Sequence, residues 1–287
     1  NACLDFKIYA SIGSIAMPGR NDLPATSSWE CNIDLHQSER GKYDMRSNSI
    51  SPIPNWAPAS NGTLRQFANY MVSGYNIDQG QVYDYISYNL ASIGTLPKSG
   101  SLTYNFTANT LDPDGLSIDW KNLWTEAFKY VYATLGIPFT EDTSVDADIN
   151  LTDDESGAFS QFSGLLSEST AFVDSTQINI PLDWDGTDPS DFGDYSWHTV
   201  IHELGHTLGL GHPGNYNGAV DWDTEVEFKN DSWSMTVMSY LSQADNANIS
   251  LPYTYRSTYS AADLLALDDL YAPQGFGTTK AFTGDTT

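Results

Sequence analysis

Basic residues are scarce in this chain of 287 residues. It carries 12 lysines and arginines against 37 aspartates and glutamates, a formal net charge of −25. Nucleic acids and anionic membrane surfaces are bound by clustered lysine and arginine side chains, which twelve scattered bases do not supply. Long apolar runs are also missing, since no stretch reaches the ~18 apolar residues of a membrane span. These shortages exclude nucleic acid and membranes as partners.

Cysteine is rare as well. The chain contains two, Cys3 and Cys31, both near its beginning. A local disulfide between them would fit an oxidising, extracellular compartment, and two free thiols are the alternative.

The chain nevertheless has enough apolar material for a sizeable core, with 40% hydrophobic and 13% aromatic residues. At ~100–200 residues per domain, its length suggests one large domain or two small ones. Residues 1–62 show no lasting helical or strand period, so we expect an irregular N-terminal extension that wraps the protein or acts like a pro-segment. Residues 63–287 are expected to form the folded domain.

The patterning within residues 63–287 mixes helices and strands. One helix is expected between its N-cap Ser117 and Gly136, and a second begins near Asp194. A third is capped by Ser260, with Asp263 completing a capping box. Strands interleaved with helices, then a loop-rich stretch closed by one helix, indicate an α+β domain. Alternating or apolar runs predict strands over residues 102–107, 145–151, 158–163 and 176–180.

The most informative stretch runs from His202 to His212 and reads HELGHTLGLGH. His202 and His206 are four residues apart, so on a helix both lie on one face and can bind one Zn²⁺ at ~2.0–2.1 Å. Glu203 lies ~100° around the helix from His202, beside the metal and not on it. Its carboxylate can therefore take a proton from metal-bound water.

A third ligand is available in His212 if the chain turns back sharply after the helix. Gly209 permits that turn, because glycine adopts the left-handed conformation at little steric cost. Three imidazoles leave one zinc position open for water, whose pKa the metal lowers to roughly 7 while it polarises a carbonyl. This combination hydrolyses amides. The alternative, three satisfied histidines on a solvated helix, would require the Gly209 and His212 spacing to arise by chance.

The remaining two histidines, His198 and His36, are not expected to bind the metal. His198, one turn before His202, is expected to pack or to act behind the ligands, although a ligand role is conceivable. His36 is expected to be exposed.

The extended motif resembles that of the metzincin metalloproteases, and Pro213 after the third histidine resembles the serralysin branch. The segment Thr236–Tyr240, which reads TVMSY, resembles the methionine turn of these enzymes. The resemblance implies that Met238 forms an apolar floor under the histidines. It also implies that Tyr240 is a further zinc ligand that swings to stabilise the oxyanion. From spacing alone, Met238 could be ordinary core and Tyr240 a rim residue.

The resemblance further implies a metzincin-like zincin fold. Residues 63–212 would form an upper subdomain with a twisted, mostly parallel sheet, long helices and the active-site helix. Residues 213–287 would form a loop-rich lower subdomain with the methionine turn and a closing C-terminal helix. The strand over residues 158–163 would be the cleft edge, on which an extended substrate pairs its backbone. The Gly-rich calcium-binding repeats of the serralysin branch are absent from the sequence.

The function expected from these observations is a secreted zinc-dependent endopeptidase. Glu203 would deprotonate the zinc-bound water and Tyr240 would support the oxyanion, with protein or peptide substrates, a proteinaceous inhibitor and a monomeric state. Two alternatives stay open: a toxin-like protease of narrow specificity, and a catalytically silent binding module stabilised by zinc. The intact Glu203 argues against the silent module, because a structural zinc site is usually closed by four protein ligands.

Calcium is a second candidate metal. An acidic loop offers hard oxygen ligands that Ca²⁺ would accept, although a solvated loop is the alternative. Its carboxylates are Asp183, Asp185, Asp188, Asp191 and Asp194.

Overall fold

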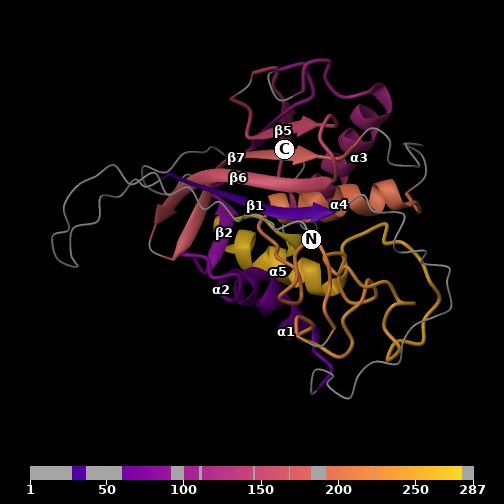
Figure 1. Ribbon diagram of the computed structural model, residues 1–287. Coiled ribbons are helices and arrows are strands. Elements are labelled where there is room, and N and C mark those ends of the chain that lie inside the picture. Colours follow the sequence, from indigo (N-terminus) through magenta and orange to yellow (C-terminus); the bar gives the residue numbers. More distant parts are fainter. Residues whose placement is uncertain are drawn as a thin grey trace, which may run out of the picture.

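The computed structural model describes residues 60–91, 100–109, 112–144, 146–167, 169–181, 192–222 and 224–279, together with the backbone of residues 28–36. Its strands form one sheet in the order β1-β6-β7-β5-β3-β4, with β2 also paired to β7 (Figure 1). The pairs β2–β7, β3–β4, β3–β5 and β5–β7 are parallel, whereas β1–β6 and β6–β7 are antiparallel. The predicted α+β fold with a mostly parallel sheet is confirmed.

The strands are β1 Ser28–His36, β2 Tyr85–Tyr88, β3 Leu102–Asn105, β4 Phe139–Glu141, β5 Ile149–Thr152, β6 Ala158–Ser167 and β7 Thr170–Asn179. The helices are α1 Leu64–Asn69, α2 Tyr75–Asp78, α3 Ile118–Leu135, α4 Tyr195–Thr207 and α5 Ala261–Tyr271, with a π-helical turn η1 Tyr70–Gly74 and a 3₁₀ turn η2 Ala272–Gln274.

Helix α3 follows its sequence signals closely. The Ser117 side chain accepts a hydrogen bond from the Trp120 N–H, and Gly136 ends the helix at φ 73°. Trp120 and Trp124 are buried in the core, as expected for packing residues. The three longest helices therefore begin where their caps predict, since Asp194 caps α4 and the capping box of Ser260 and Asp263 opens α5.

The strands differ more from their predictions. Strands β6 and β7 form a hairpin that is longer than expected, because pairing continues past a register shift between Ser163 and Gly164 as far as Ser167 opposite Thr170. Strand β5 begins only at Ile149, and all four of its residues are buried. Strand β5 lies between β3 and β7, and side chains on both of its faces are buried. The sequence had instead suggested a strand with one buried and one exposed face.

The prediction that residues 1–62 are irregular is wrong for Ser28–His36. This segment is strand β1, and it pairs antiparallel with β6 from Ser28 opposite Leu165 to His36 opposite Ala158. Its sequence, SWECNIDLH, alternates apolar with polar residues, a strand signal that the surrounding serine- and proline-rich sequence obscured. The Cys3–Cys31 disulfide lies outside the described residues, because Cys3 is not among them. The division at residue 62 stays a prediction.

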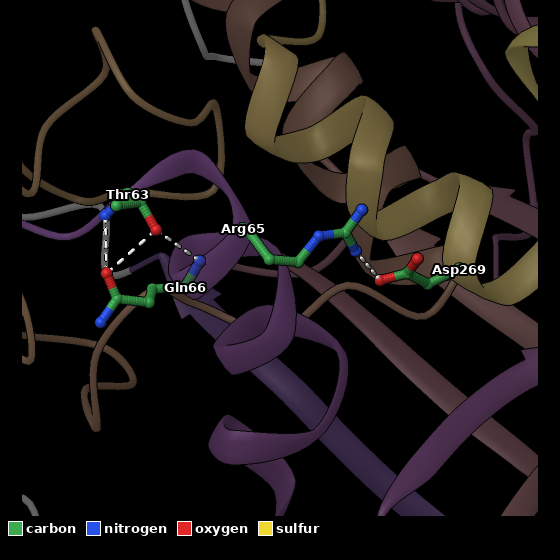
Figure 2. Close-up of polar contacts among 4 residues, drawn as sticks. All are labelled: Thr63, Arg65, Gln66 and Asp269. Carbon is green, nitrogen blue, oxygen red and sulfur yellow. Dashed lines mark hydrogen bonds and ion pairs between the residues drawn. The ribbon is translucent and has the colours of Figure 1, made fainter.

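The first helical segment braces the closing helix. Thr63 and Gln66 form a capping box at the start of α1, and Arg65 reaches across to Asp269 on α5 (Figure 2). Both members of this ion pair are partly exposed, so it contributes little to stability. The helical segment continues through η1 into α2. The carbonyl of Met71 on η1 accepts a hydrogen bond from the Gly211 N–H at 2.7 Å.

The stretch between α4 and α5 is loop-rich, as predicted. Its described residues form turns, bends and coil and contain neither helix nor strand. The apolar core gathers around α3, α4, α5 and the sheet, and α4 lies against β6 and β7. Among the described helices, none has the length and apolarity needed to cross a bilayer.

Candidate metal centre

Helix α4 carries the candidate metal ligands through the middle of the protein. Its start is fixed by Asp194, whose side chain accepts from the Trp197 N–H at 2.8 Å. Every residue from Ser196 to Thr207 is buried. Because water does not reach the polar side chains on this helix, they need hydrogen-bond partners within the protein.

The turn that ends α4 depends on Gly209. This residue has φ 101°, and a Cβ at this position would lie 2.2 Å from the Ile86 carbonyl oxygen. The turn is closed by a hydrogen bond from the Leu210 N–H to the Gly205 carbonyl at 3.0 Å. The chain then reverses and brings His212 back to the helix, as the glycine predicted.

The three histidines of the motif meet at one point. The Nε2 atom of His206 lies 3.1 Å from Nε2 of His202 and 3.1 Å from Nε2 of His212. Four ligands placed tetrahedrally at ~2.0–2.1 Å from Zn²⁺ lie roughly 3.3–3.4 Å apart. All three side chains are buried, at 1% exposure or less. Their spacing is close to that of imidazoles sharing one ion.

The opposite ring nitrogens set the protonation of the three imidazoles. Nδ1 of His202 lies 2.8 Å from the Val237 carbonyl. Nδ1 of His206 lies 2.7 Å from the Leu210 carbonyl, and Nδ1 of His212 lies 2.8 Å from that of Tyr216. A carbonyl only accepts, so each Nδ1 carries the proton and each neutral ring directs an Nε2 lone pair at the others. Three converging lone pairs repel one another unless a cation lies between them, so the donor set fits Zn²⁺.

Glu203 lies beside this centre on α4. It is fully buried, and the Ser160 hydroxyl on β6 lies 3.1 Å from its Oε2 and 2.9 Å from its carbonyl oxygen. The Thr207 hydroxyl donates to the same carbonyl at 3.0 Å. Strand β6 and helix α4 are thus joined at the residue that the sequence predicts as the base.

Met238 lies directly beneath α4. It is fully buried, and a Cβ at Gly205 would lie 2.6 Å from its Sδ atom. Glycine at this position of the helix therefore leaves the space that the sulfur occupies. Met238 thus packs against α4 at Gly205, and its role as the floor under the histidines stays a prediction.

The turn around Met238 is held by Asp263, a role that sequence reasoning missed. Its carboxylate accepts from the Thr236 hydroxyl, from the Val237 N–H at 3.1 Å and from the Ser260 N–H at 2.7 Å. Val237 thus binds Asp263 through its N–H and His202 through its carbonyl oxygen. Burial raises the pKa of Asp263 to about 6. The sequence revealed only its capping-box role, because the link to Thr236 is tertiary.

Tyr240 packs against the histidines from the loop side. Its ring centroid lies 4.4 Å from that of His212 and 6.0 Å from that of His202. The Gly218 N–H donates to its hydroxyl at 3.4 Å. Tyr240 is only partly buried, so it borders both the centre and solvent.

Comparison with known proteins supports this arrangement. The matrixin peptidase family (Peptidase_M10) matches residues 96–220. The serralysin of Proteus mirabilis is 37% identical over 106 residues, which is 35% of this chain and 20% of that protein. The metallopeptidase AprA of Pseudomonas marginalis is 36% identical over 102 residues, 34% of this chain and 20% of that protein. The resemblance to serralysin-type metzincins is confirmed.

The extent of these similarities is limited. The chain spans about a fifth of the length of the serralysins and of AprA. The match to the crystal structure of myroilysin covers 74% of this chain and 98% of that one at 17% identity, with a TM-score of 0.36 that is too low for a comparison of the folds.

The other histidines and the acidic loop singled out by the sequence are described only in part. His198 is buried against Trp233, and its Nδ1 accepts from the Arg256 N–H at 3.1 Å, so packing is its role. His36 lies on β1, of which only the backbone is described. Of the acidic loop proposed for calcium, only Asp194 is described, and it caps α4.

A second acidic group lies elsewhere in the described chain. Asp112, Asp114 and Asp154 bring carboxylate oxygens within 4.8 Å of one another. Asp112 already accepts from the Gly115 N–H at 2.7 Å and from the Asp153 N–H at 3.3 Å. Backbone donors therefore bind both oxygens of its most buried member.

Replacing Gly209 should disrupt the third ligand. We expect Gly209→Ala to lower the stability and to weaken zinc binding, because the new Cβ meets the Ile86 carbonyl and displaces the turn before His212. The measurements are thermal unfolding and zinc titration. Gly80→Ala is the matched control, since Gly80 also has positive φ but has open space around it and should cost only the backbone strain, about 1–2 kcal/mol. Equal zinc affinities for the two variants would contradict the account.

Proposed function

We propose that this protein is a zinc-dependent endopeptidase. The observation that carries the proposal is the convergence of three histidine Nε2 atoms beside a buried glutamate, with those of His202 and His212 each 3.1 Å from that of His206. The similarity to serralysins and to a metallopeptidase supports the same activity. Secretion, a monomeric state and a proteinaceous inhibitor remain predictions.

In the proposed site, His202, His206 and His212 hold the metal. Bound Zn²⁺ would lower the pKa of a water in the remaining position and polarise the scissile carbonyl. Glu203 takes the proton from the attacking water and passes it to the leaving amine. The Ser160 hydroxyl, 3.1 Å from Oε2, orients that carboxylate.

Two further side chains complete the proposed mechanism. Tyr240 either binds the metal at rest or turns its hydroxyl to the developing oxyanion, where a preorganised donor stabilises the transition state. Its partial exposure and its contact with His212 fit a group that moves between two positions. Met238 supports the histidines from below and takes no part in proton transfer.

The proposed substrate is an extended segment of a protein or peptide. Strand addition to β6 would align its backbone across Glu203, because Ser160 on β6 contacts that residue. The outer edge of β6 is paired with β1, however, with Ile33 opposite Ser160. A substrate that uses this edge must therefore displace β1.

Removing the proposed base should abolish hydrolysis without removing the metal. We expect Glu203→Gln to lower kcat/KM on casein by about 10²–10⁴-fold, the usual contribution of a general base. Its zinc affinity should stay unchanged, since the three ligands remain. Glu126→Gln, which removes an exposed carboxylate paired with Lys129, is the control and should have full activity. Undiminished casein hydrolysis by Glu203→Gln would refute the mechanism.

Weakening β1 should increase activity. Asn32 and Ile33 are adjacent on β1, so one of them donates its N–H to β6, and the double change Asn32→Pro/Ile33→Pro removes that donor. A lost hydrogen bond of about 1 kcal/mol shifts the displacement equilibrium roughly fivefold. We therefore expect a rise of that order in kcat/KM on casein.

The control for this change is Asn32→Ala/Ile33→Ala, which keeps both N–H groups. If the alanine and proline pairs have the same activity, substrate does not compete with β1 for the edge of β6.

A further inference from the structure

Tyr216 lies between the third histidine and the tyrosine of the methionine turn. It is fully buried in an otherwise irregular loop. Its ring stacks on His212 at a centroid distance of 5.4 Å and contacts Tyr240 at 5.2 Å. Its carbonyl oxygen is the acceptor for His212 Nδ1 at 2.8 Å. Tyr216 therefore touches two of the proposed functional side chains, with its backbone and with its ring.

The hydroxyl of Tyr216 is held by a buried carboxylate. It donates to Oδ2 of Asp231 at 2.9 Å, and Asp231 is fully buried. Asp231 is itself fixed, because its N–H donates to the Phe228 carbonyl at 2.9 Å and its carbonyl accepts from the Asn246 amide at 2.8 Å. Burying a carboxylate is costly unless its hydrogen bonds compensate for the lost water. Neither the motif nor the proton transfers described above uses this group.

The described residues beside Tyr216 are anchored as well. Gly214 leaves room for the ring, since a Cβ there would lie 2.5 Å from Tyr216 Cε1. The neighbouring Asn215 is anchored through its N–H to the Glu225 carbonyl and through its side chain to Gln79. The far end of the Tyr216 side chain is held by the hydrogen bond to Asp231 and by one with the Ser239 side chain.

We propose that Asp231 and Tyr216 are positioning residues of the metal centre. Asp231 fixes Tyr216 through its hydroxyl, and Tyr216 in turn fixes the carbonyl that orients His212 and the ring face on which Tyr240 rests. The proposal rests on the proposed zinc site. Groups that orient a metal-binding histidine typically change metal affinity by about 10–100-fold when they are lost.

The test is a zinc titration against a competing chelator, without substrate, on the full chain. Tyr216→Phe keeps the ring and removes the hydroxyl, so we expect its zinc affinity to fall by about 10-fold. Tyr88→Phe is the matched control. It removes a buried hydroxyl that contacts Thr176 at 2.7 Å and the Asp148 carbonyl at 3.1 Å, and it should leave zinc affinity unchanged.

A second pair of variants separates positioning from general stability. Asp231→Asn keeps an oxygen acceptor for the Tyr216 hydroxyl and should lose less zinc affinity than Asp231→Ala. Excess Zn²⁺ should restore casein hydrolysis by Tyr216→Phe, which a folding defect would not allow. If Tyr216→Phe and Asp231→Ala unfold cooperatively and bind zinc as tightly as the parent chain, the proposal is wrong. If the parent chain binds zinc but does not cleave casein, the proposed function fails while this titration still decides the positioning role.

Discussion

The structure depends on three imidazole lone pairs that converge on one point in a buried interior. Each ring donates a hydrogen bond from its Nδ1–H to a backbone carbonyl, so each Nε2 carries no proton. The Nε2 atoms of His202 and His212 each lie 3.1 Å from that of His206. Such an arrangement is unfavourable by itself and becomes favourable around a cation. The rest of the fold can be understood as the means of holding these rings in place.

The three carbonyl acceptors come from three different places along the chain. Leu210 lies in the turn after α4, Tyr216 in the loop that follows, and Val237 in the methionine turn. Asp263 ties the last of these to α5, and α5 is in turn braced by α1. The long irregular stretch between α4 and α5 is therefore structural, because it supplies acceptors that a regular helix or strand would already use internally.

Local signals predicted the local features. The spacing of His202, His206 and His212 predicted that the three side chains converge. The caps Ser117, Asp194 and Ser260 located the starts of the helices, because both effects act within a few residues. Contacts between distant segments were not predictable in this way. The second role of Asp263, the contact of Tyr216 with Asp231 and the pairing of β1 with β6 each join residues through the folded structure alone. Strand β5 was misjudged for the same reason, since its burial on both faces depends on neighbours far along the chain.

The most direct test of the central claim is X-ray absorption spectroscopy at the zinc edge on the zinc-loaded protein. The account predicts one Zn²⁺ per chain with three imidazole nitrogens at ~2.0–2.1 Å and at least one oxygen ligand. A first shell with two or fewer imidazoles, or one made of carboxylate and water oxygens alone, would contradict it.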